Sequence, residues 1–152
     1  MKLHTLLYAA LGALCSVQAV MAQTTANVVT PQNIGQQVYQ SVCIACHETG
    51  VAHAPKFGDR SAWEPLIAEG QSVLTGHAWV GVRAMPARGG STDISLQDFA
   101  RAVAYMARNA GADWQDPNPV VMKNIIREAD QRLIETIKEQ QAMQRELHKL
   151  AK

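Results

Sequence analysis

One motif constrains the fold of this chain more than any other feature of the sequence: Cys43-Ile44-Ala45-Cys46-His47. Cys-x-x-Cys-His is the attachment sequence of a c-type haem. On a helical turn, two thiols three residues apart can reach the two vinyl groups on one porphyrin edge and form thioether bonds. His47 then lies under the ring as an axial iron ligand. Because the motif occurs once, we expect one haem c, attached through Cys43 and Cys46.

Other interpretations of the cysteine pair fit the sequence less well. A thioredoxin-like redox pair needs a βαβ setting, and no stretch alternates with period two for long enough to predict a strand. A zinc site needs further ligands, and no second Cys-x-x-Cys motif supplies them. A structural disulfide within one helical turn would close a negligible loop. The motif therefore favours haem attachment.

The iron needs a sixth ligand or an open face, and the candidates are Met85, Met106, His53 and His77. Met85 lies in a predicted loop, where Pro86 restricts the approach of the chain. Met106 falls on the apolar face of a predicted helix, where methionine more often fills the core. His77 is the main rival, and His53 follows His47 too closely to face the opposite side. We expect His47 and Met85 to be the metal ligands.

A His/Met pair predicts electron transfer rather than catalysis. It raises the reduction potential relative to two histidines and leaves no vacancy for oxygen or peroxide. The sequence also contains no catalytic constellation, so we expect an electron carrier with no catalytic residues. A haem-based sensor or peroxidase, which needs a dissociable sixth ligand, is the weaker alternative.

Two further residues are candidates for contact with the cofactor. His47 is expected to donate its free ring N–H to a backbone carbonyl of the Ala54-Pro55 segment, which makes Pro55 a supporting residue. Trp63 is expected either to hydrogen-bond a haem propionate or to form a hydrophobic wall.

The N-terminus predicts export. Lys2 and His4 precede a run without charge from Leu6 to Ala22, which is typical of a signal peptide over 1–22. An uncleaved anchor is the alternative. Cleavage would place the protein in a bacterial periplasm without a membrane span. It would also remove Cys15, so that Cys43 and Cys46 would be the remaining cysteines. Residues 23–30 are small and polar and predict a flexible N-terminal segment.

Apolar residues recur at helical spacing through the rest of the chain, so the predicted fold class is all-α. Short helices are expected over 59–69, with Ser61 and Glu64 as a candidate capping box, and over 71–80. Ser95 and Asp98 open the clearest helix. Gly35 and Tyr39 in the first helix are expected to pack against Tyr105. We predict a monohaem domain over 31–116.

The tail over 117–152 is predicted to be one amphipathic helix. Asn118-Pro119 is a helix start, and no Gly or Pro follows from Val120 to Leu150. Its apolar stripe consists of Met122, Ile126, Ala129, Leu133, Ile137, Gln140, Met143, Leu147 and Leu150. Such a stripe is costly to leave in water, so we expect it to dock on its own haem domain, on a second copy or on a redox partner. A solvated single helix without a partner is the alternative.

The charge of the chain excludes one class of partner. Lys+Arg is 14 and Asp+Glu is 13, a formal net charge of +1. A generic nucleic-acid binder needs a clear excess of basic residues. We therefore expect protein redox partners, an electron donor and an acceptor, and no nucleic acid. The tail could also make the protein a subunit of a stable enzyme complex.

Taken together, several segments resemble a class I cytochrome c, most closely the cytochrome c5 type. They are Val42 to His47, Ala54-Pro55-Lys56-Phe57-Gly58-Asp59, Trp63, and Ala84-Met85-Pro86-Ala87-Arg88-Gly89-Gly90. The resemblance runs from about Val38 to Met106. It implies a small helical fold around one haem, with His47 as the proximal and Met85 as the distal ligand. Many c5-type proteins carry an extra cysteine pair after the Gly-Gly, and this chain lacks it.

Overall fold

The computed structural model describes residues 31–151, and these form an all-α chain. The predicted signal peptide (1–22) and N-terminal segment (23–30) lie outside the described residues. The elements are α1 (Pro31–Val38), the π-helical turn η1 (Tyr39–Cys43), α2 (Ile44–His47), the 3-10 turn η2 (Val51–His53), α3 (Arg60–Ala68), α4 (Gln71–Val80), the turn η3 (Ala87–Gly90), α5 (Leu96–Asn109) and α6 (Pro119–Leu150). Within this range the extended pairing is limited to one bridge between Val82 and Met85. The predicted fold class is confirmed. None of these helices is apolar over enough residues to span a bilayer.

The first helical stretch leads directly into the cysteine motif. Val38 and Ile44, which flank η1, both have right-handed helical dihedral angles, so α1, η1 and α2 continue one another. The wider π turn buries Tyr39 and Cys43 on the inner side. Single π turns often occur in helices at functional sites.

The crossing of α1 and α5 fixes the position of this helical stretch. A Cβ atom at Gly35 would lie 2.6 Å from the Arg101 carbonyl oxygen and 3.1 Å from Tyr105 Cβ. Only glycine permits such an approach of the two backbones. The ring centroids of Tyr39 and Tyr105 are 5.9 Å apart. The predicted packing of Gly35 and Tyr39 against α5 is confirmed.

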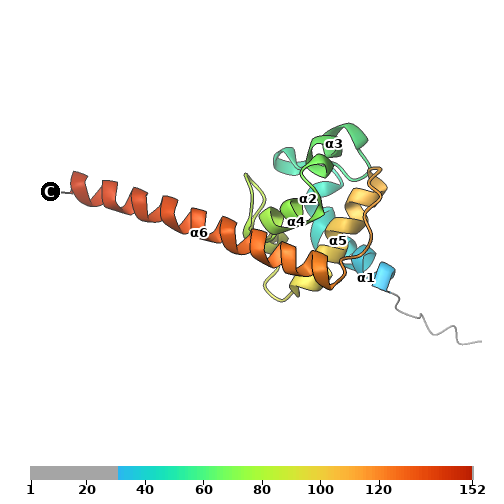
Figure 1. The fold of residues 1–152 in the computed structure, drawn as a ribbon. Helices are drawn as coiled ribbons and strands as arrows, with labels where there is room; N and C mark the ends of the chain where they lie inside the picture. Colours follow the sequence, from blue (N-terminus) through green and yellow to red (C-terminus); the bar gives the residue numbers. More distant parts are fainter. Residues whose placement is uncertain (1–30, 152) are drawn as a thin grey trace, which may run out of the picture.

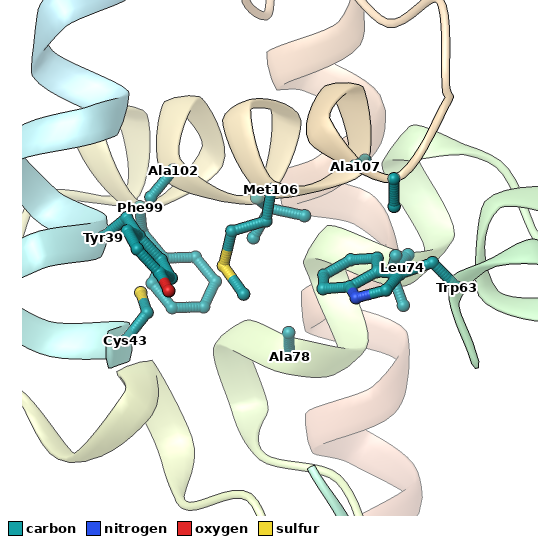
Figure 2. Packing of buried hydrophobic residues seen from close by; sticks show 11 residues of the cluster. Tyr39, Cys43, Trp63, Leu74, Ala78, Phe99, Ala102, Met106 and Ala107 are labelled. Atoms are coloured by element: carbon teal, nitrogen blue, oxygen red, sulfur yellow. The ribbon is translucent and has the colours of Figure 1, made fainter. Parts of the chain in front are cut away.

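The core lies between α5, α4 and the stretch that carries Cys43. Figure 2 shows Phe99, Met106 and Ala107 reaching from α5 toward Ala78 of α4, with Tyr39 and Cys43 on one side and Leu74 and Trp63 on the other. The α5 side of this core includes Ala102 and Ala107, both fully buried.

Helix caps explain most of the boundaries. Ser95 accepts a hydrogen bond from the Asp98 N–H and begins α5, as predicted, and Asn118 accepts from Val120 and Val121 to begin α6. The predicted capping box at Ser61 is wrong. Asp59 caps α3 instead, accepting from the backbone N–H groups of Ser61 and Ala62. The Ser61 hydroxyl also donates to Asp59. This hydrogen bond, and then those of the backbone N–H groups, hold the pKa of the Asp59 carboxyl below its usual value.

Helix α6 docks on its own chain over its first third. A Cβ atom at Gly76 of α4 would lie 2.7 Å from Glu128 Cβ and 2.9 Å from the Ala129 nitrogen, so the two helices touch at their backbones. Ile125 and Ala129 are buried at this contact, and Ile126, which the predicted stripe includes, is 55% exposed. Figure 1 shows that the rest of α6 projects away from the body of the molecule.

The segment between α5 and α6 is held by contacts at residues 114–116. Arg108 forms an ion pair with Asp116 at 2.9 Å and donates to the Trp114 carbonyl oxygen. The Gln71 side chain donates to the Gln115 carbonyl oxygen at 2.9 Å. These contacts set the direction in which α6 begins.

The α1–α5 crossing yields a first prediction. Glycine-to-alanine changes inside a helix ordinarily stabilise it by about 0.5–1 kcal/mol. Gly35→Ala is expected to reduce the free energy of unfolding by about 1–3 kcal/mol instead, because the methyl group meets backbone of α5. Denaturant unfolding of the holoprotein measures the difference. Gln36→Ala, at an exposed position of the same helix, is the control and is expected to change stability little. A Gly35→Ala variant as stable as the control would contradict the close crossing.

The docked part of α6 yields a second prediction from two adjacent isoleucines. Ile125→Ala removes a fully buried side chain and is expected to cost about 2–5 kcal/mol of unfolding free energy. Ile126→Ala is expected to stay within about 0.5 kcal/mol of the wild type when unfolding is measured at a concentration too low for chains to associate, because within one chain its side chain lies mostly in water. Equal effects of the two substitutions in thermal unfolding would show that α6 is not docked in this register.

Candidate functional site

The two cysteines and the histidine of the motif occupy the end of the first helical stretch. Cys43 is the last residue of η1, and Cys46 and His47 belong to α2. Cys43 is buried and Cys46 is exposed, and both are free thiols. Burial, and secondarily the neighbouring Cys46, raises the pKa of the Cys43 thiol to about 11. The motif therefore presents one thiol to the core and one to the surface.

The imidazole of His47 is held in one tautomer. His47 is 8% exposed, and its Nδ1 lies 2.9 Å from the Pro55 carbonyl oxygen. A carbonyl oxygen only accepts hydrogen bonds, so Nδ1 carries a proton, and the neutral tautomer that fits this bond has its lone pair on Nε2. This is the hydrogen bond that the sequence predicts for the Ala54-Pro55 segment.

Residues 54–57, here called the strap, are fastened to the motif by further bonds. The Phe57 N–H donates to the His47 carbonyl oxygen at 2.7 Å. The Phe57 ring stacks on Tyr39 with centroids 4.3 Å apart, and Tyr105 lies on it at 5.5 Å. The strap is therefore tied to α2 through His47, and to η1 and α5 through an aromatic stack.

Tyr39 of η1 also bonds Glu48, the residue that follows the Cys-x-x-Cys-His motif. Its hydroxyl donates to Glu48 Oε2 at 2.8 Å. Burial and this carboxylate raise the pKa of the Tyr39 phenol above its ordinary value. The phenol therefore stays protonated and keeps donating throughout the physiological pH range.

The indole N–H of Trp63 is bonded to the protein backbone. Its indole N–H donates to the Lys56 carbonyl oxygen at 2.8 Å, and its side chain is 4% exposed. An indole has a single N–H, which this hydrogen bond uses, so the arrangement favours the hydrophobic wall of the two roles that the sequence suggests. The ring centroid of Trp63 lies 6.2 Å from that of His47, which places the indole as an apolar neighbour of the imidazole.

Met85 lies at the end of a tight turn after α4. Its N–H donates to the Val82 carbonyl oxygen at 2.9 Å, and its own carbonyl oxygen accepts from the Val82 N–H at 3.1 Å. Arg83 within the turn has a φ of +54°, a conformation that non-glycine residues rarely adopt. The Met85 side chain is half-buried against the cluster that contains Cys43.

The segment after Met85 is anchored on two sides. The Arg88 guanidinium lies over the Trp79 ring of α4, 4.9 Å from its centroid, and Trp79 meets Phe99 edge-on at 5.4 Å. A Cβ atom at Gly89 would lie 3.2 Å from Val42 Cγ1, so this turn touches the helix just before Cys43. The structure thus brings the Met85 loop and the cysteine motif to one core.

The three rival ligands lie in different surroundings. Met106 is 3% exposed, and Figure 2 shows its side chain pointing into the middle of the cluster. His77 is half-buried in α4 and His53 is exposed in η2. Of the two methionines, Met106 is therefore a core residue of helix α5, and Met85 lies on a loop.

Several contributors to the site carry no clear signal in the sequence. The Lys56 carbonyl oxygen, which accepts from Trp63, belongs to the backbone, and nothing in the local sequence distinguishes it from neighbouring carbonyls. The contact between Arg88 and Trp79 joins residues from separate elements. Phe57, which completes the aromatic stack, stands out only as an aromatic residue two positions after Pro55 in a chain with 5% aromatic residues.

Comparisons with known proteins agree with this arrangement. Residues 30–106, which are 77 of the 152 residues, match a family model described as "Cytochrome C oxidase, cbb3-type, subunit III". The chain is 40% identical over 76 residues to cytochrome c-555 of Chlorobaculum thiosulfatiphilum, covering 47% of this chain and 88% of that protein. It is 36% identical over 75 residues to cytochrome c5 of Azotobacter vinelandii, covering 48% of this chain and 90% of that protein.

A solved structure is also similar. A chain of "Crystal structure of electron transfer complex of nitrite reductase with cytochrome c" is 43% identical, with a TM-score of 0.49, over 51% of this chain and 94% of that chain.

The family model spans half of the chain, and the two named relatives are matched over almost their whole length. The protein therefore belongs to the cytochrome c family, as a class I member of the cytochrome c5-like kind.

Proposed function

We propose that this protein carries single electrons between redox proteins through one haem c, attached at Cys43 and Cys46 and ligated by His47 and Met85. As a cytochrome c, it is an electron carrier rather than an enzyme. When bound, the haem supplies an Fe(III)/Fe(II) couple.

The hydrogen bond from His47 to Pro55 carries this proposal. It commits Nδ1 as a donor and leaves Nε2 as a lone-pair ligand, which is how metal-ligating histidines are oriented in proteins. The carbonyl partner also makes the imidazole a better donor to iron. The residues present therefore fit the group that the family implies.

The surroundings of the thiols support covalent attachment. Cys43 and Cys46 are one helical turn apart, one buried and one exposed, and neither forms a disulfide. They are free to bond the two vinyl groups of one porphyrin edge. The buried cluster beside Cys43 consists of apolar side chains, which would exclude water from the iron.

Met85 is proposed as the sixth ligand because its backbone is fixed while its side chain remains free. The paired bonds to Val82 and the anchor at Arg88 hold the loop, and the thioether is half-buried at the core. A neutral thioether stabilises Fe(II) and raises the reduction potential.

We also propose the division of the chain and its location. Residues 1–22 act as a signal peptide, 23–30 as a flexible segment, 31–116 as the haem domain and 117–152 as an appended helix. The signal peptide would direct the protein to the periplasm. Its electron donor and acceptor would be other redox proteins.

Substitution of Met85 tests the ligand set. Met85→Ala is expected to open the sixth coordination site, because no other side chain on the anchored loop replaces the thioether. The oxidised protein should become high-spin, should lose the weak red absorption band of methionine-bound Fe(III), and should bind cyanide readily.

Two variants serve as controls for this experiment. Met106→Leu and His77→Ala are expected to keep the low-spin spectrum of the wild type. An unchanged spectrum in Met85→Ala, with a lost red band in Met106→Leu or a high-spin His77→Ala, would assign the ligand to the other residue.

The role of Trp63 yields a separate prediction. Trp63→Phe keeps an aromatic wall but removes the donor to the Lys56 carbonyl oxygen, so unfolding free energy is expected to fall by about 1–3 kcal/mol. The reduction potential is expected to stay at the wild-type value, because the indole N–H bonds the strap and not the cofactor. Trp114→Phe, which leaves the strap untouched, is the control. A clear shift in potential with unchanged stability would restore the propionate role.

A further inference from the structure

The projecting part of α6 concentrates exposed apolar side chains. From Leu133 onward every described residue of the helix except Thr136 is exposed. The large apolar side chains in this part are Leu133, Ile134, Ile137, Met143, Leu147 and Leu150. Met143 and Leu147 are 66% and 60% exposed. Surface area of this kind marks an interaction site.

These residues follow a heptad. Leu133, Gln140 and Leu147 recur at one position, and Thr136, Met143 and Leu150 recur three residues later. Alternating steps of three and four residues form the seam of a two-helix coiled coil. The stripe therefore fits another helix better than a flat surface.

The charges of the segment favour a copy of itself. Residues 133–151 contain Lys138, Arg145 and Lys149 against Glu135, Glu139 and Glu146. A membrane with anionic lipids would call for an excess of basic residues, and a strongly charged protein for an excess of the opposite sign. Two copies of a balanced helix do not repel each other.

The position of single residues favours an antiparallel pair. With the two helices centred on Lys138, Leu133 lies opposite Met143 of the second copy. The two polar seam residues, Gln140 and Thr136, lie opposite each other, so the polar layers meet in the middle. Leu150 meets Ile126 of the second copy, the isoleucine that the docked segment leaves exposed.

The charged residues that flank the seam also favour the antiparallel orientation. In the antiparallel register Arg132 of each copy faces Glu146 of the other, which places two ion pairs on one flank of the pair, against one unfavourable Glu139–Glu139 approach between them. In a parallel pair the same flanking positions set Arg132 beside Ile137 and Glu139 beside Gln144, with no ion pair. Charges at such flanking positions set the orientation of coiled coils.

We propose that α6 pairs in antiparallel orientation with α6 of a second copy of this chain. The protein is then a homodimer with its two haem domains at opposite ends. The docked residues Ile125 of the two copies would lie about 40 Å apart along the helices, from 26 residues at 1.5 Å each. Each haem face then remains open to its own redox partner.

Sedimentation of the full holoprotein over a concentration series tests the pairing. The wild type is expected to sediment as a species of twice the monomer mass. Met143→Glu and Leu147→Glu, each of which places a charge in the apolar seam, are expected to raise the dissociation constant at least about tenfold. Gln141→Glu, on the outer side of the same helix, is the matched control and is expected to remain dimeric. The haem spectrum should be identical in all four proteins, since residues 141–147 lie beyond the docked segment.

A spin label at Lys149→Cys tests the orientation. Two labels are expected about 35 Å apart in the antiparallel dimer, from 22 residues of helix between them. A distance below about 20 Å would mean parallel pairing, since paired helices lie about 8–10 Å apart, and would overturn the proposal. A monomeric wild type, or a dimer that neither seam substitution weakens, would overturn it as well.

Discussion

The hydrogen bond from His47 Nδ1 to the Pro55 carbonyl oxygen is the contact around which the rest of the site is built. A carbonyl oxygen can hold the ring only if the strap that carries it is itself immobile. Three interactions provide this: the Phe57 N–H bonds the His47 carbonyl, the Trp63 indole bonds the Lys56 carbonyl, and the Phe57 ring lies in an aromatic stack. The strap thus satisfies its own backbone groups while it fixes one tautomer of a histidine. Such support explains how a neutral imidazole can present one nitrogen in one direction.

Helix α4 is the element that the two halves of the molecule share. One of its faces supplies Leu74 and Ala78 to the core beside Cys43, and Trp79 near its end receives the Arg88 guanidinium and so holds the Met85 loop. On another side Gly76 lets α6 approach within backbone contact. The proposed sixth ligand and the C-terminal helix are therefore fastened to the same ten residues. Helix α4 would transmit a displacement of α6 to the Met85 loop directly, because no flexible linker lies between the two contacts.

The sequence predicted those features that local chemistry determines. The helix starts at Ser95 and Asn118 follow from side chains that accept from N–H groups two or three residues on, and the α1–α5 crossing follows from one glycine. The capping box at Ser61 was wrong because Asp59, two residues earlier, has the extended backbone that a cap requires, and composition does not reveal a dihedral angle. The stripe included Ile126 where the structure buries Ile125, because helical spacing identifies an apolar face but not the direction from which a neighbour approaches. The partner of the Trp63 indole is the Lys56 carbonyl, and no side chain near Lys56 indicates that this carbonyl is the acceptor.

The projecting part of α6 is helical because the docked part of the same helix precedes it. An isolated helix of 18 residues is marginal in water, because forming its first turn fixes several dihedral angles for one hydrogen bond. Here the first turn is already formed by the Asn118 cap and by the packing of Ile125 and Ala129 against α4, so the remaining residues only extend an existing helix. Docking therefore explains why the projecting part is helical, but it does not explain why that part is apolar along one stripe. A solvated extension would need only polar helix formers, and the heptad of leucine and methionine beyond the docked segment requires a second surface against which it is buried.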